Sequence, residues 1–413
     1  MNRRAFIQTA GVLGAAAIQC KSSIKESAVS ESLLQEAADR PVFKKELFPS
    51  PVIIESLQLL EHDGVYYLRA RSRDGAVGYA VSNEMHLANL YPLLIKRLIP
   101  FFIGKDAREL DDLLEALYRA DSNYKYQGLA FWVCQATVEF ALLDLLGRIA
   151  GKPMGELIGE THHRRIAVYQ ANNYRGKSAE ESAVLIEKTV REIGAKAAKF
   201  KVGGRMSKNQ DDPPGRTEKL IPLVRKVLGD DITIYADSNG SYDVPHSIRI
   251  GRMLEDIRAG FFEEPCPFDH YDETRQIAEA LTVPIAGGEQ DSSLWLFKWM
   301  IANGALQVVQ PDLFYFGGMI RSMKVARMAE AAGIVCTPHI SGTGLGYLYM
   351  LHFVSVVANA GPYHEFKGFA DLPIVCDTSS LNVENGMIVV PSGPGLGVEF
   401  EPSLIKRLRS VTA

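Results

Sequence analysis

The feature that most constrains the fold of this chain is a repeat of short apolar runs that each lead into an ionisable residue. The clearest runs lead into Asp237, Glu263, Glu289, Asp312 and His339. They recur at a period of about 25 residues, and a segment of helical length follows each, which is the pattern of a βα unit. In a closed parallel barrel the carboxyl ends of the strands meet on one face, where catalytic residues sit. The repeat therefore predicts an α/β barrel with polar groups gathered on one rim.

The same predicted barrel contains two lysines. Its second strand, residues 195–202, carries Lys199 and Lys201 two positions apart and hence on one face. Because helices cover the outer face of a parallel barrel, both amines should point inward, where a charge without a partner is costly. The last predicted strand, residues 363–366, contains Glu365. Charges of both signs are thus expected inside the barrel.

A different pattern precedes the repeat. Residues 52–80 alternate apolar and polar side chains, and Asp63-Gly64 and Asp74-Gly75 are two-residue signals of β-hairpins. Residues 131–149 are apolar almost all round, as in a helix buried between layers. Residues 46–160 are therefore predicted to form an N-terminal α+β domain. The whole chain is predicted to consist of an export signal at 1–20, a linker at 21–45, this domain, a barrel at 161–366 and a C-terminal segment at 367–413 that returns to the first domain.

Composition excludes several classes of function. The 413 residues are 47% hydrophobic, which suffices for a large core. The formal net charge is -4, and the lysines and arginines are dispersed, so nucleic acid is not an expected partner. Five cysteines lie far apart without a C-x-x-C pair, which argues against a disulfide framework and a zinc site.

The first 20 residues resemble a twin-arginine export signal. Arg3-Arg4 precedes an apolar run, residues 10–18, that is too short to span a bilayer but has the length of a signal's apolar region. Cys20 is a candidate lipid anchor, although Gln19 departs from the small residue usually found there. We expect an exported protein, periplasmic or anchored to the membrane. The alternative is a frayed N-terminus on a cytoplasmic protein.

Three carboxylates, those of Asp237, Glu263 and Glu289, end three successive strands and should therefore be neighbours on the rim. Carboxylates so close repel one another unless a cation lies among them, and a set of oxygen ligands suits Mg²⁺. One such carboxylate alone would more often be a helix cap or a surface group. Glu264 should alternate to the opposite face, so we leave it out of the metal site.

A second constellation should flank these carboxylates. Lys201 lies on a strand before them, and His339 lies on a strand after them, next to the strand that leads into Asp312. A carboxylate beside an imidazole fixes its tautomer and stabilises the imidazolium, as a general base requires. A lone histidine is more often structural, but the pairing of His339 with Asp312 favours a catalytic role.

These residues resemble the enolase superfamily, specifically its mandelate racemase subgroup. The muconate-lactonizing subgroup fits less well, because it would place a lysine near Asp312 and lack the histidine–aspartate pair. The match covers about residues 45–402 and is specific as an ordered set. Its motifs are Lys199-Phe200-Lys201, Asp237-Ser238-Asn239-Gly240, Glu263-Glu264-Pro265, Gly287-Gly288-Glu289, Pro311-Asp312, Pro338-His339 and Glu365.

The resemblance implies a fold and a set of roles. The fold is a (β/α)7β modified TIM barrel with an α+β capping domain. Lys199 would bind substrate, and Glu365 would hydrogen-bond an enolate. The metal Mg²⁺ would be held by Asp237, Glu263 and Glu289, and the acid and base groups would be Lys201 and the His339–Asp312 pair.

The expected reaction is removal of the proton α to a carboxylate in a hydroxy acid or sugar acid. Dehydration to a 2-keto-3-deoxy acid is the leading interpretation, and racemisation, epimerisation or cycloisomerisation of an anhydro-sugar acid are alternatives. An exported binding protein without turnover is the alternative from another class, but it would need no opposed bases. We expect a small carboxylate as the binding partner and a homo-oligomer as the assembly. Loops near 48–52 and 81–88 are expected to set specificity.

Overall fold

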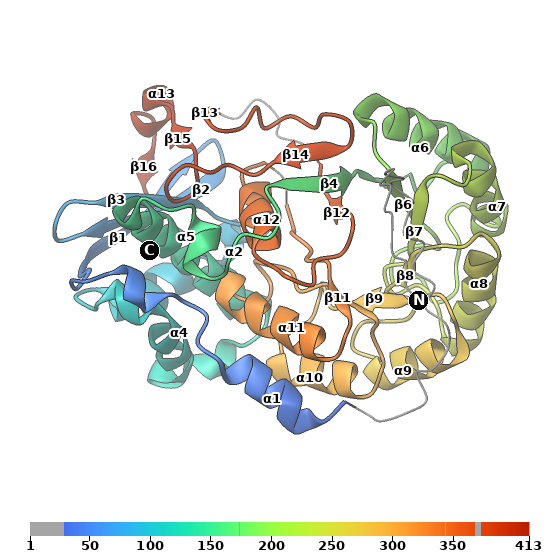
Figure 1. Ribbon diagram of the computed structural model, residues 1–413, viewed down its shortest axis with the longest axis horizontal. Coiled ribbons are helices and arrows are strands. Elements are labelled where there is room, and N and C mark those ends of the chain that lie inside the picture. The colour runs from blue at the N-terminus through green and yellow to red at the C-terminus, as the bar shows by residue number, and fades with distance from the viewer. Residues whose placement is uncertain (1–28, 173, 343, 368–372, 413) are drawn as a thin grey trace, which may run out of the picture.

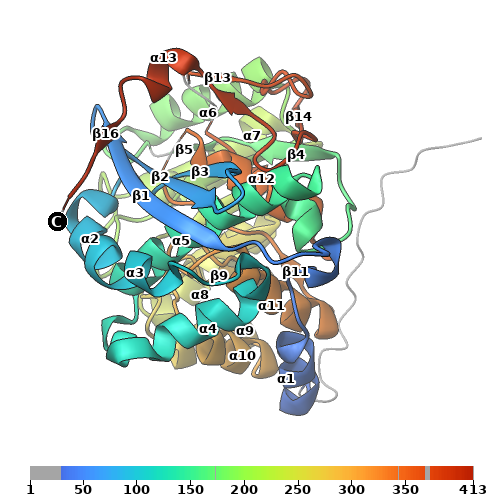
Figure 2. The same cartoon turned by 90° about the vertical axis from the view of Figure 1, so that its left-hand side faces the viewer.

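The computed structural model describes residues 29–172, 174–342, 344–367 and 373–412 (Figure 1). The predicted export signal and Cys20 lie outside the described residues. Figures 1 and 2 show a barrel with its ring of helices beside a smaller unit of sheet and helices. Cys134, Cys266, Cys336 and Cys376 are free thiols.

The N-terminal unit is built on an antiparallel sheet. Its meander consists of β1 (Ile54–His62), β2 (Val65–Ser72) and β3 (Val77–Val81). Asp63 and Gly64 both have positive φ, as a two-residue hairpin turn requires. The strand nearest the C-terminus, β16 (Arg409–Ser410), pairs with the free edge of β1. The first and last strands of the described chain therefore pair in one sheet.

Helices cover one face of this sheet. The helices in contact with its strands are α3 (Ile99–Phe102) and α5 (Leu129–Ala150), and α2 (Leu87–Leu93) and α4 (Leu110–Arg119) pack on α5. All residues of α5 from 131 to 147 are buried, and the helix ends at Gly151 in the left-handed conformation. A Cβ on Gly78 of β3 would lie 2.3 Å from the Leu145 nitrogen, so strand and helix backbones touch. In the described chain α5 alone is long and apolar enough to cross a membrane, but 89% of its most apolar stretch is buried, as in a core helix.

The barrel is a closed ring of parallel strands. Strands β5 to β11 pair in sequence order, β12 pairs in parallel with β4, and a bridge between Cys336 and Ala360 links β11 to the segment before β12. The strands are β4 (Arg165–Tyr169), β5 (Ala171–Asn172), β6 (Ala197–Lys201), β7 (Thr233–Asp237), β8 (Phe261–Glu263), β9 (Ile285–Gly287), β10 (Val308–Val309), β11 (Val335–Cys336) and β12 (His364–Glu365).

An outer layer of helices covers these strands. They are α6 (Ala179–Ile193), α7 (Arg216–Leu228), α8 (Val244–Asp256), α9 (Tyr271–Ala280), α10 (Leu294–Ala302), α11 (Met319–Ala331) and α12 (Gly346–Ser355). The predicted (β/α)7β barrel with an α+β capping domain is confirmed. The domain limits at 160 and 366 stay predictions.

The barrel interior has an apolar floor below a polar rim. Tyr235 stacks on Phe261 with ring centroids 3.8 Å apart. Asp237 lies two residues after Tyr235, so the period-two alternation of a strand points both inward. Strand register places Asp237 opposite both Lys201 and Glu263. The floor consists of Tyr169, Ala197, Tyr235, Phe261, Ala286 and Val308.

The predicted linker at 21–45 is wrong for its second half. Residues 31–39 form helix α1 (Glu31–Asp39), which buries Leu34, Ala37 and Ala38 and packs on α10 and α11 of the barrel. Lys298 of α10 lies 3.7 Å from Glu31. The polar composition suggested a tether, but apolar residues at helical spacing give the segment one buried face.

The C-terminal segment joins the barrel to the cap. Its elements are β13 (Ile374–Val375), β14 (Met387–Val389), β15 (Glu399–Phe400) and α13 (Pro402–Ile405), and β14 pairs antiparallel with β4. The Leu396 amide donates to Asp144 of α5 at 2.7 Å.

Candidate active site

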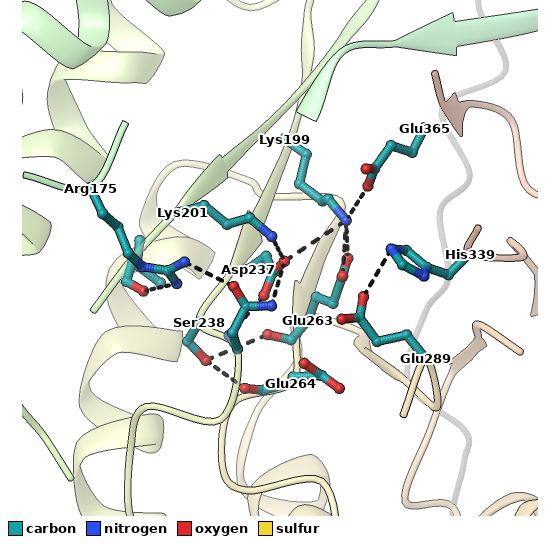
Figure 3. Close-up of polar contacts among 12 residues, drawn as sticks. Arg175, Lys199, Lys201, Asp237, Ser238, Glu263, Glu264, Glu289, His339 and Glu365 are labelled. Carbon is teal, nitrogen blue, oxygen red and sulfur yellow. Dashed lines mark hydrogen bonds and ion pairs between the residues drawn. The ribbon is translucent and has the colours of Figure 1, made fainter. Parts of the chain in front are cut away.

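The eight residues predicted for the site converge on the carboxyl end of the barrel; Figure 3 labels all of them except Asp312, which is hydrogen-bonded to His339. The residues Lys199, Lys201, Asp237, Glu263 and Glu365 lie in strands β6, β7, β8 and β12. Glu289 lies in the turn that follows β9, and Asp312 and His339, just beyond β10 and β11, pair with each other in a parallel β-bridge. In Figure 3, Lys201 and His339 flank the central carboxylates from opposite sides.

Lys199 is a fully buried cation of the site. Its amine lies 2.8 Å from both Glu263 carboxylate oxygens, 2.8 Å from Glu365 and 3.9 Å from Asp237. Lys201, two residues further along β6, forms an ion pair with Asp237. Burial alone would lower the pKa of Lys199, but Glu263 and Glu365 outweigh it and hold that pKa well above its usual value. Lys199 is therefore a permanent cation in this arrangement.

The three predicted metal carboxylates are buried side by side. Burial raises the pKa of Glu263, and the charge of Asp237 adds to the effect. Burial acts in the same direction on Asp237 and Glu289, but Lys201 outweighs it at Asp237 and His339 at Glu289, so both pKa values are lowered. Neighbouring cations thus keep Asp237 and Glu289 negatively charged, whereas at Glu263 burial and the charge of Asp237 outweigh the effect of Lys199.

Glu264 corrects the sequence interpretation. We expected strand alternation to turn it away from the rim, but its φ of 42° is left-handed and breaks that alternation. Figure 3 draws its side chain beside Glu263 and Glu289, and these two carboxylates with Asp237 help to raise its pKa, after burial itself. Its Oε1 is buried without a hydrogen-bond partner among the described residues.

These oxygens fit a hard divalent cation. In the described part of the chain, no three His, Cys, Asp or Glu side chains already lie in a metal-binding arrangement. The amines of Lys199 and Lys201 lie against the carboxylates and balance their charge. An unpaired buried carboxylate oxygen on Glu264 beside three further carboxylates is chemistry that suits Mg²⁺.

His339 and Asp312 form a hydrogen-bonded pair. The Nδ1 of His339 lies 2.7 Å from Asp312 Oδ2, and the other carboxylate oxygen accepts from the backbone amides of Phe314 and Tyr315 at 2.8 Å. Nε2 lies 3.5 Å from Glu289. Burial lowers the pKa of His339, but Glu289 and Asp312 outweigh it and raise that pKa to about 9. Asp312 therefore orients the ring and supports the imidazolium.

Sequence reasoning missed Arg175. This residue follows β5, and its guanidinium donates to the carbonyls of Val202 at 3.1 Å and Gly203 at 2.8 Å and to the Asn239 side chain at 2.9 Å. Asn239 in turn donates from its backbone to Asp237 at 2.8 Å. Arg175 thus ties together the ends of the strands that carry Lys201 and Asp237. It belongs to no motif, so no sequence signal could have identified it.

The cap loop at 81–88 reaches the His339 side of the site. Asn83 donates to Ser341 Oγ at 2.8 Å, and Ser341 lies 3.3 Å from Asp312. His86 and the Tyr315 hydroxyl are 2.9 Å apart. In the loop at 48–52, the Phe48 carbonyl accepts a hydrogen bond from Arg108, and the Val52 amide donates one to Asp106. Both partners belong to the cap, so the role of this loop in specificity stays a prediction.

Two family models match the chain. Residues 51–159 match the mandelate racemase / muconate lactonizing enzyme N-terminal domain, and residues 181–404 match the enolase C-terminal domain-like family. Arabinonate dehydratase of Saccharolobus solfataricus is 30% identical over 338 residues, which cover 81% of this chain and 88% of that protein.

Solved structures agree with these matches. A Roseobacter denitrificans protein provisionally named a racemase is 32% identical, with a TM-score of 0.81 over 87% of this chain and 99% of its own. A mandelate racemase/muconate lactonizing protein of Paracoccus denitrificans, complexed with magnesium, is 25% identical, with a TM-score of 0.77 over 87% and 99% of the two chains.

The fold and the strand-end site define an enzyme of the enolase superfamily, as its motifs predicted. Within it, the chain belongs to the family of mandelate racemase and muconate lactonizing enzyme. Proteins similar to this chain are named as lyases and isomerases, and members of the superfamily generally bind Mg²⁺.

Proposed function

We propose that this chain is a Mg²⁺-dependent dehydratase that converts an acid sugar into a 2-keto-3-deoxy acid. The observation that carries the proposal is the placement of Lys201 and the His339–Asp312 pair on opposite sides of a buried carboxylate cluster. A racemase needs two such groups to exchange one proton, and a dehydratase needs a base and an acid. Similarity to an arabinonate dehydratase favours the second reading.

The metal would be held by Asp237, Glu263 and Glu289. When bound, Mg²⁺ would neutralise the negative charge that grows on the substrate carboxylate as the α-proton leaves. The residues at this end of the barrel would position that carboxylate beside Lys199, whose amine carries a fixed positive charge.

The chain's own groups would move the protons. One of the two opposed groups takes the α-proton as the carbon–hydrogen bond breaks, and the choice between Lys201 and His339 depends on the configuration at the α-carbon. The bond from the β-carbon to its hydroxyl oxygen then breaks, and the other group donates a proton so that water leaves. His339 is well suited to donate, because Asp312 stabilises its charged form. The remaining enol becomes the 2-keto acid.

Glu365 has a different role from the expected one in this proposal. A carboxyl group donates a hydrogen bond to an enolate only when it is protonated. Although burial opposes it, Lys199 and Lys367 hold the pKa of Glu365 well below its usual value, so it is an acceptor. We infer that Glu365 supports Lys199, and that it could donate only after Lys199 turns to the substrate.

The test is a screen of sugar acids and hydroxy acids for 2-keto product, before and after chelation and after Mg²⁺ is restored. We expect product only with metal, and Mn²⁺ binding to the apoprotein that is lost in Asp237→Asn. Full activity after exhaustive chelation, confirmed by elemental analysis, would refute the metal requirement.

The two proton-transfer roles are separable in D₂O. We expect His339→Asn and Lys201→Ala each to abolish dehydration, while loss of the leaving-group acid alone still permits α-deuteration. Racemisation or epimerisation predicts interconversion of α-epimers without 2-keto product, and cycloisomerisation predicts a constitutional isomer that has the mass of the substrate when the reaction is run in H₂O. Either result in the wild type would replace dehydration as the function.

A further inference from the structure

A buried carboxylate of the capping domain reaches the turn that follows Asp312. Glu139 lies on α5, is fully buried and accepts a hydrogen bond from the Ile320 amide at 3.1 Å. Ile320 is in the first turn of α11, where amides lack partners within the helix. The capping domain therefore provides a hydrogen-bond acceptor for the first turn of α11. The turn that precedes α11 begins at Asp312, a residue of the proposed active site.

Two glycines make this contact feasible. Gly317 and Gly318 have φ of 93° and 115°, which L side chains rarely adopt. A Cβ on Gly318 would lie 2.3 Å from Glu139 Oε2, and one on Gly317 would lie 2.8 Å from the Trp132 ring of α5. The turn thus allows the cap helix to approach its backbone directly.

Further contacts lie on the same face of α5. Gln135 donates to the Gly317 carbonyl at 3.1 Å, and the Arg321 guanidinium lies 3.7 Å from the centre of the Trp132 ring. Positions 132, 135 and 139 are three and seven residues apart, so one helical face makes all three contacts. Arg321 also donates to the Phe316 carbonyl at 2.7 Å.

The turn from 312 to 318 is tightly closed. Phe316 donates to the Asp312 carbonyl at 2.9 Å, and Gly318 donates to the Leu313 carbonyl at 2.9 Å. The Asp312 side chain accepts from the amides of Phe314 and Tyr315. Gly318 is therefore hydrogen-bonded to the residue next to Asp312, whose carboxylate orients His339.

We propose that Glu139 is a positioning residue of the capping domain, which holds the Asp312 turn and, through it, the imidazole of His339. The hydrogen-bond acceptor is the feature that matters. Burial raises the pKa of Glu139 to about 8, against the opposing effect of the Ile320 and Met319 amides, and Asp111 and Arg321 are the charged groups that face it. A protonated glutamic acid has nearly the same shape as glutamine, and each has a carbonyl oxygen that can accept the hydrogen bond from Ile320. We therefore expect Glu139→Gln to keep this contact.

The decisive comparison is between Glu139→Gln and Glu139→Met in the full chain. Both keep the length of the side chain, but only glutamine keeps an acceptor. The readout is the low-field proton on His339 Nδ1 in ¹⁵N-histidine-labelled protein, assigned by its loss in His339→Asn. We expect Glu139→Gln to retain this signal and Glu139→Met to broaden it or to speed its exchange at least tenfold. A wild-type signal in Glu139→Met, or equal loss in both variants, would overturn the proposal.

Asp144→Asn is the matched control. Asp144 is also a fully buried carboxylate on α5, but it accepts from Tyr79 and Leu396 and not from the Asp312 turn. We expect this control to lower stability and leave the His339 signal unchanged. Loss of that signal in Asp144→Asn would mean that any disturbance of α5 reaches His339, which would contradict a specific role for Glu139.

A second readout rests on the proposed function. In D₂O, exchange of the α-proton from the His339 side should slow at least tenfold in Glu139→Met, and exchange from the Lys201 side should not. Equal slowing on both sides would overturn the positioning role. If no acid is turned over by the wild type, the proposed function fails, and the imidazole signal still decides the role of Glu139.

Discussion

At the scale of single residues, this site is organised around a lysine that carboxylates surround. Lys199 is 1% exposed, and its amine contacts Glu263 and Glu365 at 2.8 Å. A buried ion pair adds little net stability, but removal of one partner leaves an unpaired buried charge. The charge balance at this lysine therefore couples stability to metal binding.

Replacement of Lys199 by methionine should destabilise the metal-free protein by about 3–5 kcal/mol, because Glu263 and Glu365 lose their cation. Added Mg²⁺ should restore part of this loss, since it binds the folded state and supplies positive charge. Urea unfolding with and without Mg²⁺ measures both effects. Lys188→Met, at a side chain that is 65% exposed, is the control and should change little. A methionine variant as stable as the wild type without metal would contradict the charge balance described here.

Glu139 should make stability fall as the pH rises. Its pKa is raised to about 8 in the folded protein from 4.5, because burial disfavours the carboxylate. Between these values the folded state keeps a proton that the unfolded state releases, so the free energy of unfolding drops by up to about 1.4 kcal/mol per pH unit. Glu139→Gln has no carboxyl group to titrate here, so its free energy of unfolding should rise relative to that of the wild type between pH 5 and pH 8. Urea unfolding at both pH values measures the difference, and a pH-independent difference would refute it.

At the scale of elements, the least expected structure is α1. Its apolar residues occur at helical spacing, and they cover part of α10 and α11 on the outside of the barrel. Arg327 of α11 donates to the carbonyls of Arg40 and Pro41 just beyond the helix. The chain therefore contacts the outside of the barrel before β1, its first strand, begins.

The neighbouring leucines of α1 provide a matched test of this attachment. Leu34 is fully buried, whereas Leu33 is 45% exposed. Loss of a buried leucine costs about 2–5 kcal/mol, so Leu34→Ala should release α1 from the barrel, and Leu33→Ala should not. Hydrogen exchange of the amides in 31–39 and limited proteolysis report the release. Equal protection in both variants would mean that α1 docks by its polar contacts alone.

At the scale of the whole molecule, the cap and barrel are joined at several places. The joints are the β16–β1 pair, the contact between Leu396 and Asp144, the loop at 81–88 and the face of α5 that carries Glu139. Of these joints, the loop at 81–88 reaches Asp312 through Ser341, and the face of α5 contacts the segment that follows Asp312. Assembly into a homo-oligomer stays a prediction that sedimentation can test.

Export is a further prediction at this scale. The Arg3-Arg4 pair and the apolar run at 10–18 predict a mature chain that begins near Cys20 and lies outside the cytoplasm. Expression of the full chain followed by fractionation and mass spectrometry of its N-terminus tests this. We expect loss of the signal and a lipid mass on Cys20 if it is anchored, and Arg3-Arg4→Lys-Lys should block processing. Protein found only in the cytosol with its N-terminal segment intact would contradict export.

The sequence by itself determined the barrel and most of the proposed site. A strand that ends in a carboxylate at regular spacing leaves little freedom, because parallel strands bring their carboxyl ends to one rim and alternation sets the inward face. Asp237, Glu263 and Glu289 could therefore be placed from the sequence. The pairing of Asp312 with His339 followed from adjacent strands.

Only the tertiary structure decided the contacts that depend on backbone conformation or on distant segments. A left-handed φ at Glu264 reversed its predicted side, and local alternation cannot anticipate such a change. Arg175 and Glu139 act on segments 28 and 181 residues away, and neither lies in a motif. Helix α1 was mistaken for a linker because its buried face exists only where α10 and α11 cover it. Period and composition report local preference, whereas these features arise from packing between elements.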